Sequence, residues 1–300
     1  MLLTHSFSLL AAAALVSSEC TRESLIAARD EFFKASGSGT PKAAANVKIS
    51  FNNKITPLAQ TPFSKLSGFT QFLVQAVDTE ICEIATFRVA TTQLLSTRLK
   101  LDTTGTLSEI EFLQAVSGDQ FFRPSGFPAK EPAMFNKPQS PGSPPTVPAT
   151  WDAKGYPGIP DKDVNKATCK SSAGAARKLT RKELIYVSST YADGLKGEPW
   201  ASCVIGSSPC PRNENGVTTT NNCAVGTGMF GFAVKGRRWV ADVETGVVLG
   251  NFYFDYTGLA ALATQNLYLH EYFKVEAGKL AYIFAPMKNI PKAQASAAIF

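Results

Sequence analysis

An internal repeat constrains the fold of this chain more than any other feature of its sequence. The segment Thr21–Ile26 (TRESLI) recurs as Thr180–Ile185 (TRKELI), and in the same alignment Phe32 falls opposite Tyr191. Each segment starts with a threonine that can cap a helix and continues with apolar residues at helical spacing. Both segments therefore predict an amphipathic helix, and each helix is expected to open one of two similar folding units.

Matching strand patterns follow both helices. The run Arg98–Asp102 with the turn after it corresponds to Tyr272–Glu276 with its own turn, if one residue is inserted. Long alternating patterns, such as Val247–Tyr256 and Leu267–Phe284, predict antiparallel strands. We therefore expect the α+β class, with helices packed on an antiparallel sheet in each half.

Two polar landmarks lie between the helix and the last strands of each half. Asp78 stands opposite Asp242, and Asn52 stands opposite Glu214. Because the order and spacing of all these landmarks agree, the alignment favours an internal duplication over chance similarity.

A proline-rich segment separates the halves. Ten of the eighteen prolines lie between Arg123 and Pro160, and proline both removes a backbone donor and fixes an extended path. We therefore predict a first unit at 19–130, expected to be structural, a linker at 131–164, and a second unit at 165–300 that holds the candidate site.

The N-terminal residues predict export. A short apolar run, Leu9–Val16, is followed by Ser17 and Ser18, which is typical of a secretory signal peptide cleaved after Ser18, although no Lys or Arg precedes the run. The run is too short to span a bilayer, and no other apolar stretch is long enough. We expect a secreted protein without a membrane span.

Six cysteines in a chain predicted to be secreted favour disulfides over free thiols. If each half pairs its own cysteines, Cys20 bonds Cys82. Three arrangements then remain open in the second half, and we favour Cys210 with Cys223 and Cys169 with Cys203. Zinc is disfavoured because there is no CxxC pair and only one histidine remains after cleavage. We predict no metal and no other cofactor.

Charge and motif content disfavour nucleic-acid and nucleotide binding. The chain has 30 basic and 24 acidic residues, a net charge of +6, and no strongly basic stretch. Gly226–Gly231 matches GxGxxG, but a polar segment precedes it and a strand pattern follows it, whereas a dinucleotide site needs a strand before and a helix after.

Several longer segments carry a resemblance to a known family. These segments are CTRESLIAARDEFF, DTEICEIATFRV, FFRPSGFP, CPRNENG and RRWVADVETGVVLG. Together they resemble a family of uncharacterised fungal secreted proteins with tandem units. The strand-turn-strand LHEYFKVEAGKLAYI is similar to the end of the nuclear transport factor 2-like, or ketosteroid-isomerase-like, fold.

The resemblance implies two cone-shaped units, each with a pocket between its helices and a curved sheet. Enzymes of that superfamily isomerise, dehydrate or cyclise small apolar molecules without a cofactor. Members also commonly form homodimers through the open sheet face, and pairing of the two units within this chain could replace such a dimer.

Glu214 is the leading acid/base candidate of the second unit. It lies between Cys210 and Cys223, so a disulfide there would hold its loop in place, and carboxylates serve as general bases. The alternative is an ordinary turn residue beside Asn215. The matching residue of the first half, Asn52, cannot exchange a proton, which favours the second unit as the site.

The other candidates are potential donors and ligand contacts. His270 shares a strand face with Tyr268 and Tyr272, so it could donate to an oxyanion or simply face solvent. Asp242 follows two arginines, and a structural ion pair is the alternative role for it. The full set comprises Glu214, His270, Tyr253 and Asp242 as catalytic candidates and Arg212, Asn215 and Arg238 as ligand-binding candidates.

These features support two functional hypotheses. In the first, the protein binds a small apolar secondary metabolite of the polyketide or terpenoid class, or acts on it as a cofactor-free isomerase, lyase or cyclase. In the second, it is a non-catalytic secreted protein that binds a ligand or a partner. A closed apolar pocket containing a carboxylate would favour the first, and a cone filled by its own Phe and Tyr rings the second.

Overall fold

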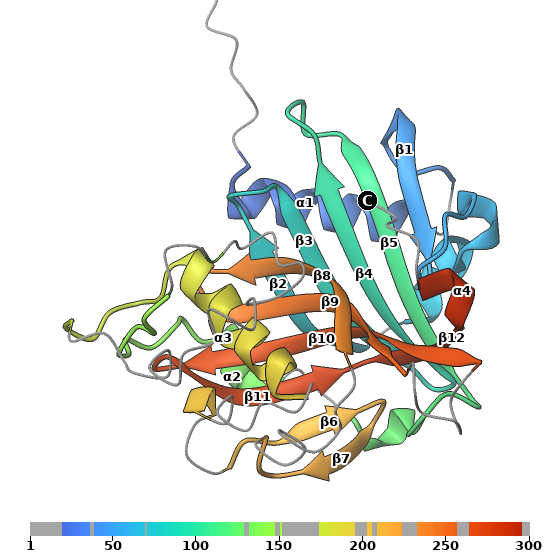
Figure 1. Ribbon diagram of the computed structural model, residues 1–300. Coiled ribbons are helices and arrows are strands. Elements are labelled where there is room, and N and C mark those ends of the chain that lie inside the picture. The colour runs from blue at the N-terminus through green and yellow to red at the C-terminus, as the bar shows by residue number, and fades with distance from the viewer. Residues whose placement is uncertain are drawn as a thin grey trace, which may run out of the picture.

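Two mixed β-sheets dominate the part of the chain that the structure describes (Figure 1). The computed structural model describes residues 20–36, 39–69, 71–128, 132–147, 151, 174–195, 203–205, 209–223, 233–256 and 264–295. The predicted signal peptide and much of the predicted linker lie outside these residues.

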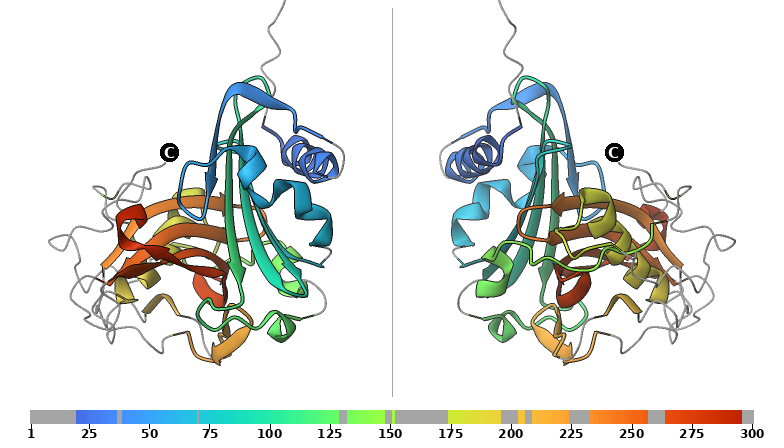
Figure 2. Two further views of the ribbon diagram at one scale, coloured as in Figure 1. Left: turned by 90° about the vertical axis from the view of Figure 1, so that its right-hand side faces the viewer. Right: turned by 90° about the vertical axis from the view of Figure 1, so that its left-hand side faces the viewer.

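The first sheet has five strands in the order β1-β5-β4-β3-β2, and β1 runs parallel to β5 while the other pairs are antiparallel. Helix α1 lies on its outer face (Figure 2) and buries Leu25 and Phe32. The elements are α1 (Arg22–Ala35), β1 (Ala43–Phe51), η1 (Leu58–Gln60), η2 (Pro62–Gly68), β2 (Gln71–Asp78), β3 (Glu83–Ala90), β4 (Gln93–Leu101), β5 (Leu107–Val116), η3 (Pro124–Gly126) and α2 (Ala133–Asn136).

The second sheet has seven strands, with β7-β6-β11-β10-β9-β8 in order and β12 paired to β10. Its β6-β11-β10-β9-β8 portion repeats the order of the first sheet, and β6 runs parallel to β11 as β1 does to β5. The elements are α3 (Arg181–Leu195), β6 (Arg212–Glu214), β7 (Val217–Thr220), β8 (Ala233–Asp242), β9 (Val247–Asp255), β10 (Gln265–Glu276), β11 (Lys279–Ala285), β12 (Met287–Pro291) and α4 (Lys292–Ala295).

Both long helices start where the sequence predicts. The hydroxyl oxygen of Thr21 accepts a hydrogen bond from the backbone N–H of Ser24 at 3.1 Å. At the start of α3, the Glu183 carboxylate accepts from the backbone N–H of Thr180 at 2.8 Å, and the Thr180 hydroxyl accepts from the N–H of Glu183 at 3.4 Å. This reciprocal capping satisfies backbone donors that a helix start leaves open.

The two sheets pack face to face, with the long helices on their outer sides (Figure 2). Residues from both sheets share one apolar cluster between them, in which the ring of Phe87 stacks on that of Tyr272 with centroids 6.0 Å apart. Each sheet also packs on its own long helix through a further apolar cluster. One cluster lies between the first sheet and α1, and the other lies between the second sheet and α3. The central strands of each sheet are therefore covered on both faces.

The expected fold class is wrong. The described part of the chain is mostly β, in two mixed sheets with few helices, and is not an α+β arrangement of cone-shaped units with helices packed on a curved sheet. Within the described residues each sheet carries one long helix, because its other face packs on the other sheet. The strand patterns predict the strands but do not say what covers each face.

Reciprocal ion pairs join the halves at the start of each long helix. The Arg22 guanidinium donates to both carboxylate oxygens of Asp242, at 2.8 and 2.9 Å, and Arg181 Nε donates to Asp78 at 2.7 Å. Each aspartate also accepts a backbone N–H from the opposite half, that of Val77 to Asp242 and that of Ala241 to Asp78. The aligned residues of the repeat thus make equivalent contacts.

Asp78→Asn and Asp242→Asn are each expected to lower the free energy of unfolding by about 2 kcal/mol, because each leaves a largely buried arginine without its carboxylate. Urea denaturation measures the change. Glu244→Gln is the matched control, since Glu244 lies 3.5 Å from Arg22 but is mostly exposed. If the aspartate variants lose no more stability than this control, the ion pairs do not hold the halves together.

Two of the three predicted disulfides are confirmed. Cys20 bonds Cys82, which ties the start of α1 to the β2–β3 turn, and Cys210 bonds Cys223 around β6 and β7. The third predicted bond involves Cys169, which lies outside the described residues. Among the helices that the structure describes, none is long and apolar enough to cross a membrane.

Candidate functional site

Glu111 of β5 lies at the centre of a polar network between the sheets. Its fully buried carboxylate accepts hydrogen bonds from Arg98 Nε at 2.8 Å and from Asn251 Nδ2 at 2.8 Å. An Arg238 guanidinium nitrogen and the Tyr268 hydroxyl both donate to its other oxygen at 2.5 Å. Donors from both sheets therefore converge on one carboxylate, which links the two halves.

The network keeps Glu111 ionised. Burial alone would raise the pKa of Glu111, but Arg238 and Arg98 outweigh it and hold this pKa well below the usual range. Arg98 also pairs with Glu83 at 3.0 Å and with Glu109 at 2.7 Å.

His270 belongs to the same interface. Its Nδ1 lies 2.7 Å from the Ser96 hydroxyl and its Nε2 lies 3.1 Å from the Tyr268 hydroxyl, while Ser96 also contacts the Tyr272 hydroxyl at 2.7 Å. Burial lowers the pKa of His270 to about 3, so the imidazole is neutral near neutral pH. With no exposed surface, this histidine serves the packing of the sheets.

A second polar cluster lies on the opposite face of β10, toward α3. Glu271 is only 2% exposed there, between Leu269 and Phe273 of the same apolar face. Glu214 of β6 is in register with Ala285 of β11, the strand that pairs with β10. Arg212 donates to the Tyr191 hydroxyl at 2.9 Å and lies 3.5 Å from the Glu214 carboxylate.

Glu271 is an unusual carboxyl group. Its Oε2 is buried and has no hydrogen-bond partner among the described residues. Burial raises the pKa of Glu271 to about 8; Arg212 lowers it and Glu214 raises it further. Near neutral pH this side chain is therefore largely a carboxylic acid, which can donate a proton.

Two tyrosines complete the cluster. Burial raises the pKa of Tyr191 well above its usual value, against the opposing effect of Arg212, so its hydroxyl keeps its proton. Burial, assisted by Glu214, raises the pKa of Tyr256 to about 12. The cluster thus combines a buried acid, a second carboxylate whose side chain is 16% exposed, and phenolic hydroxyls that can stabilise an oxyanion.

The structure brings Arg212 and Glu214 together but places the other candidates elsewhere. His270 and Arg238 lie in the interface between the sheets, and Tyr253 packs against a small apolar group beside the same interface. The oxygens of Asp242 bind Arg22 and backbone N–H groups. These contacts give Asp242 a structural role.

The side chain of Asn215 is occupied by backbone groups. Its Nδ2 donates to the carbonyls of Gln120 and Met287 at 2.7 and 2.9 Å, and its Oδ1 accepts the N–H of Met287 at 2.8 Å. Asn52 accepts the N–H of Gln114 in the same way, and both asparagines have a left-handed backbone, with φ of 50° at Asn52 and 47° at Asn215. Asn52 therefore corresponds to Asn215 in the structure. The sequence alignment placed Asn52 opposite Glu214, which is one residue away.

Sequence reasoning did not choose Glu271 or Glu111. A signal for Glu271 was available, since it is the one ionisable residue on an otherwise apolar strand face with Leu267, Leu269 and Phe273. No comparable signal marks Glu111, because alternating acids at positions 109 and 111 are also typical of a solvent-facing strand.

Comparison with known proteins finds a family model that is similar to part of the second half. A model described as a domain of unknown function (DUF8021) matches residues 177–287, which run from just before α3 to the start of β12. The match covers less than half of the chain, so the similarity concerns that half alone. It includes Tyr191, Arg212, Glu214 and Glu271. No curated protein matches the chain.

Among the residues that the structure describes, no group of three or more His, Cys, Asp or Glu side chains is arranged to hold a metal ion.

Proposed function

We propose that the second half of this protein performs cofactor-free acid/base chemistry on a small, mostly apolar molecule. The observation that carries the proposal is Glu271, a buried carboxyl with an unpaired oxygen beside Arg212 and within the influence of Glu214. A carboxyl whose proton is held to about pH 8 is suited to proton transfer near neutral pH.

The cluster supplies each role that such chemistry needs. In an isomerisation, Glu214 takes a proton from a carbon next to a carbonyl, and the electron pair moves to the carbonyl oxygen. Tyr191, held by Arg212, and protonated Glu271 donate hydrogen bonds to that oxygen. When the substrate carries a C=C bond next to that carbon, Glu214 returns the proton to the far carbon of this bond, the double bond shifts toward the carbonyl, and the carbonyl re-forms. In a dehydration, Glu214 takes the same proton, the electron pair forms a new C=C bond, and Glu271 protonates the hydroxyl on the neighbouring carbon, which departs as water.

The surroundings favour an apolar substrate. Leu269, Phe273 and Ala285 lie on the same apolar side of the sheet as Glu271, and Tyr191 packs on Phe273 with ring centroids 5.5 Å apart. A polyketide or terpenoid ketone with an acidic C–H group matches both this lining and the proposed chemistry.

Proton exchange into such ketones tests the proposal. In D₂O, the full chain is expected to catalyse exchange at the carbon next to the carbonyl, followed by NMR. Glu214→Gln is expected to slow exchange by roughly 10²–10⁴-fold, because an amide cannot act as a base. Glu271→Gln should also slow it, whereas Glu80→Gln, at an exposed turn, should not. Equal rates in the parent and in both cluster variants would overturn the proposal.

A non-catalytic binding function is the second candidate, because the protein's own rings fill much of the same face. Trp239 lies 6.1 Å from Phe252 and 6.3 Å from Phe273, centroid to centroid. Ketone binding without any exchange, in the parent as in the variants, would favour this function.

We further propose that the chain is secreted, with residues 1–18 removed as a signal peptide. The two described disulfides support an oxidising compartment, since such bonds persist in exported proteins.

A further inference from the structure

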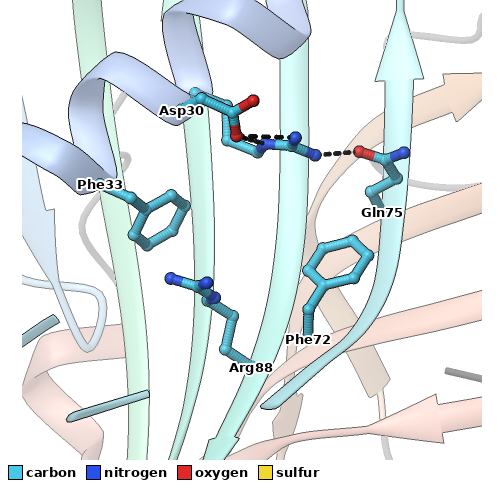
Figure 3. Close-up of a pocket in the computed structure, with 6 residues that line it drawn as sticks. Asp30, Phe33, Phe72, Gln75 and Arg88 are labelled. Carbon is cyan, nitrogen blue, oxygen red and sulfur yellow. Dashed lines mark hydrogen bonds and ion pairs between the residues drawn. The ribbon is translucent and has the colours of Figure 1, made fainter. Parts of the chain in front are cut away.

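A separate pocket lies in the first half, between α1 and the β2–β3 hairpin (Figure 3). It has a volume of about 250 Å³, below the range of pockets for drug-sized ligands, so it suits a small molecule. Its lining residues are Arg29, Asp30 and Phe33 from α1, Phe72 and Gln75 from β2, and Arg88 from β3.

Arg88 is the distinctive member of this lining. Its Nε is buried without a hydrogen-bond partner, and no described residue forms an ion pair with its guanidinium. The guanidinium carbon lies 4.4 Å from the centroid of the Phe33 ring, which fixes its orientation. A buried donor without a partner costs free energy unless a ligand or solvent supplies an acceptor.

Arg29 is already engaged. Its guanidinium pairs with the Asp30 carboxylate at 2.8 Å and donates to the Gln75 side chain. Asp30 is 65% exposed, so the pocket has two guanidinium groups but only one carboxylate, at its rim. Its net charge is positive, which favours an anionic ligand.

The second half fills the equivalent place. In the repeat, Gln75 of β2 corresponds to Trp239 of β8, because each lies three residues before the aligned aspartate, Asp78 or Asp242. In the strands that pair with them, Arg88 of β3 corresponds to Phe252 of β9. Trp239 and Phe252 pack on each other in the core under α3. The first half therefore has a cationic pocket where the second half has packed rings.

We propose that this pocket binds a small aromatic monocarboxylate. The carboxylate takes the unpaired Arg88 guanidinium, which presents two parallel donors to such a group. The ring lies between Phe33 and Phe72, which flank the space between Arg88 and Gln75 (Figure 3). This site is independent of the acid/base cluster in the other half.

Calorimetric titration of the full chain with benzoate tests the site. The parent is expected to bind benzoate, and to bind neutral benzamide at least about tenfold more weakly, because the amide cannot form the ion pair. Arg88→Met, which keeps the apolar stem, is expected to weaken benzoate binding by about tenfold or more. Arg177→Met is the matched control, since Arg177 is exposed and pairs with Glu183 elsewhere.

Two further variants test the role of the paired donors and the location of the site. Arg88→Lys keeps the charge but loses the two parallel donors, so its affinity is expected to lie between those of the parent and Arg88→Met. Glu271→Gln should bind benzoate as the parent does. Equal affinity for benzoate and benzamide, absence of benzoate binding by the parent, or unchanged binding in folded Arg88→Met would each overturn the proposal.

Discussion

Glu111→Gln is expected to lower the free energy of unfolding by about 3–5 kcal/mol, the cost of removing one partner from a buried ion pair. The variant leaves Arg98 and Arg238 without the carboxylate that both of them bind between the sheets. The neutral amide offers only one acceptor oxygen in place of two, so some of the donors around it lose their partner. Urea denaturation at neutral pH measures the effect.

Glu109→Gln is the matched control for this prediction. Glu109 also pairs with Arg98, at 2.7 Å, but its side chain is 17% exposed, and Arg238 and Tyr268 donate to Glu111. We expect its loss to stay below about 1 kcal/mol, as for other partly solvated pairs. Equal losses in the two variants would mean that the charge on Glu111 does not hold the sheets together.

The same network makes the interface sensitive to acid. The pKa of Glu111 in the folded state lies below its ordinary value of 4.5. Its contribution to the free energy of unfolding is therefore present above pH 4.5 and is lost as the pH falls below 4.5. His270 has a folded-state pKa of about 3 against an ordinary 6.5, so the unfolded chain binds its proton first and stability falls as the pH drops below 6.5. Both effects act in the same direction.

Glu271→Gln is expected to have the opposite pH signature. Folded Glu271 keeps its proton up to about pH 8, whereas the unfolded chain releases it near its ordinary value of 4.5. Between these two pH values the unfolded state binds fewer protons than the folded state. Ionisation of Glu271 therefore lowers the free energy of unfolding of the parent by up to about 1.4 kcal/mol for each pH unit of increase. The neutral glutamine removes that loss, and the variant should become increasingly more stable than the parent toward pH 8.

Denaturation curves of the parent and Glu271→Gln between pH 5 and pH 8 measure this difference, roughly over the span of the two pKa values. Glu80→Gln should run parallel to the parent, because Glu80 is exposed. Parallel curves for Glu271→Gln as well would show that Glu271 ionises in the folded state as it does in the unfolded chain. If Glu271→Gln gains stability at high pH and also loses the proton exchange into ketones, Glu271 is a residue that serves function and lowers the stability of the protein.

Local signals in the sequence were enough to predict the two long helices and several of the strands. Thr21 and Thr180 mark the starts of α1 and α3, and the alternating pattern from Val247 matches β9, Val247–Asp255. The two described disulfides agree with the predicted pairs. Caps, strand periodicity and cysteine pairing within a half depend on residues close in the chain or within one unit.

The sites depended on contacts that no local pattern contains. Strand alternation on β10 separates His270 from Glu271, but it does not say which face packs on the other sheet and which packs on α3. The first face met Ser96 and Glu111 from the other half, and the second met Arg212 and Tyr191.

The sequence by itself determined the starts of the two long helices, several strands, two disulfides and the paired landmarks Asp78 and Asp242. Only the tertiary structure decided that the two sheets face each other, that Asn52 corresponds to Asn215, and that Glu271 is buried without a full set of partners. The physical reason is that periodicity specifies which residues share a face, whereas burial and pKa follow from what a distant segment brings to that face.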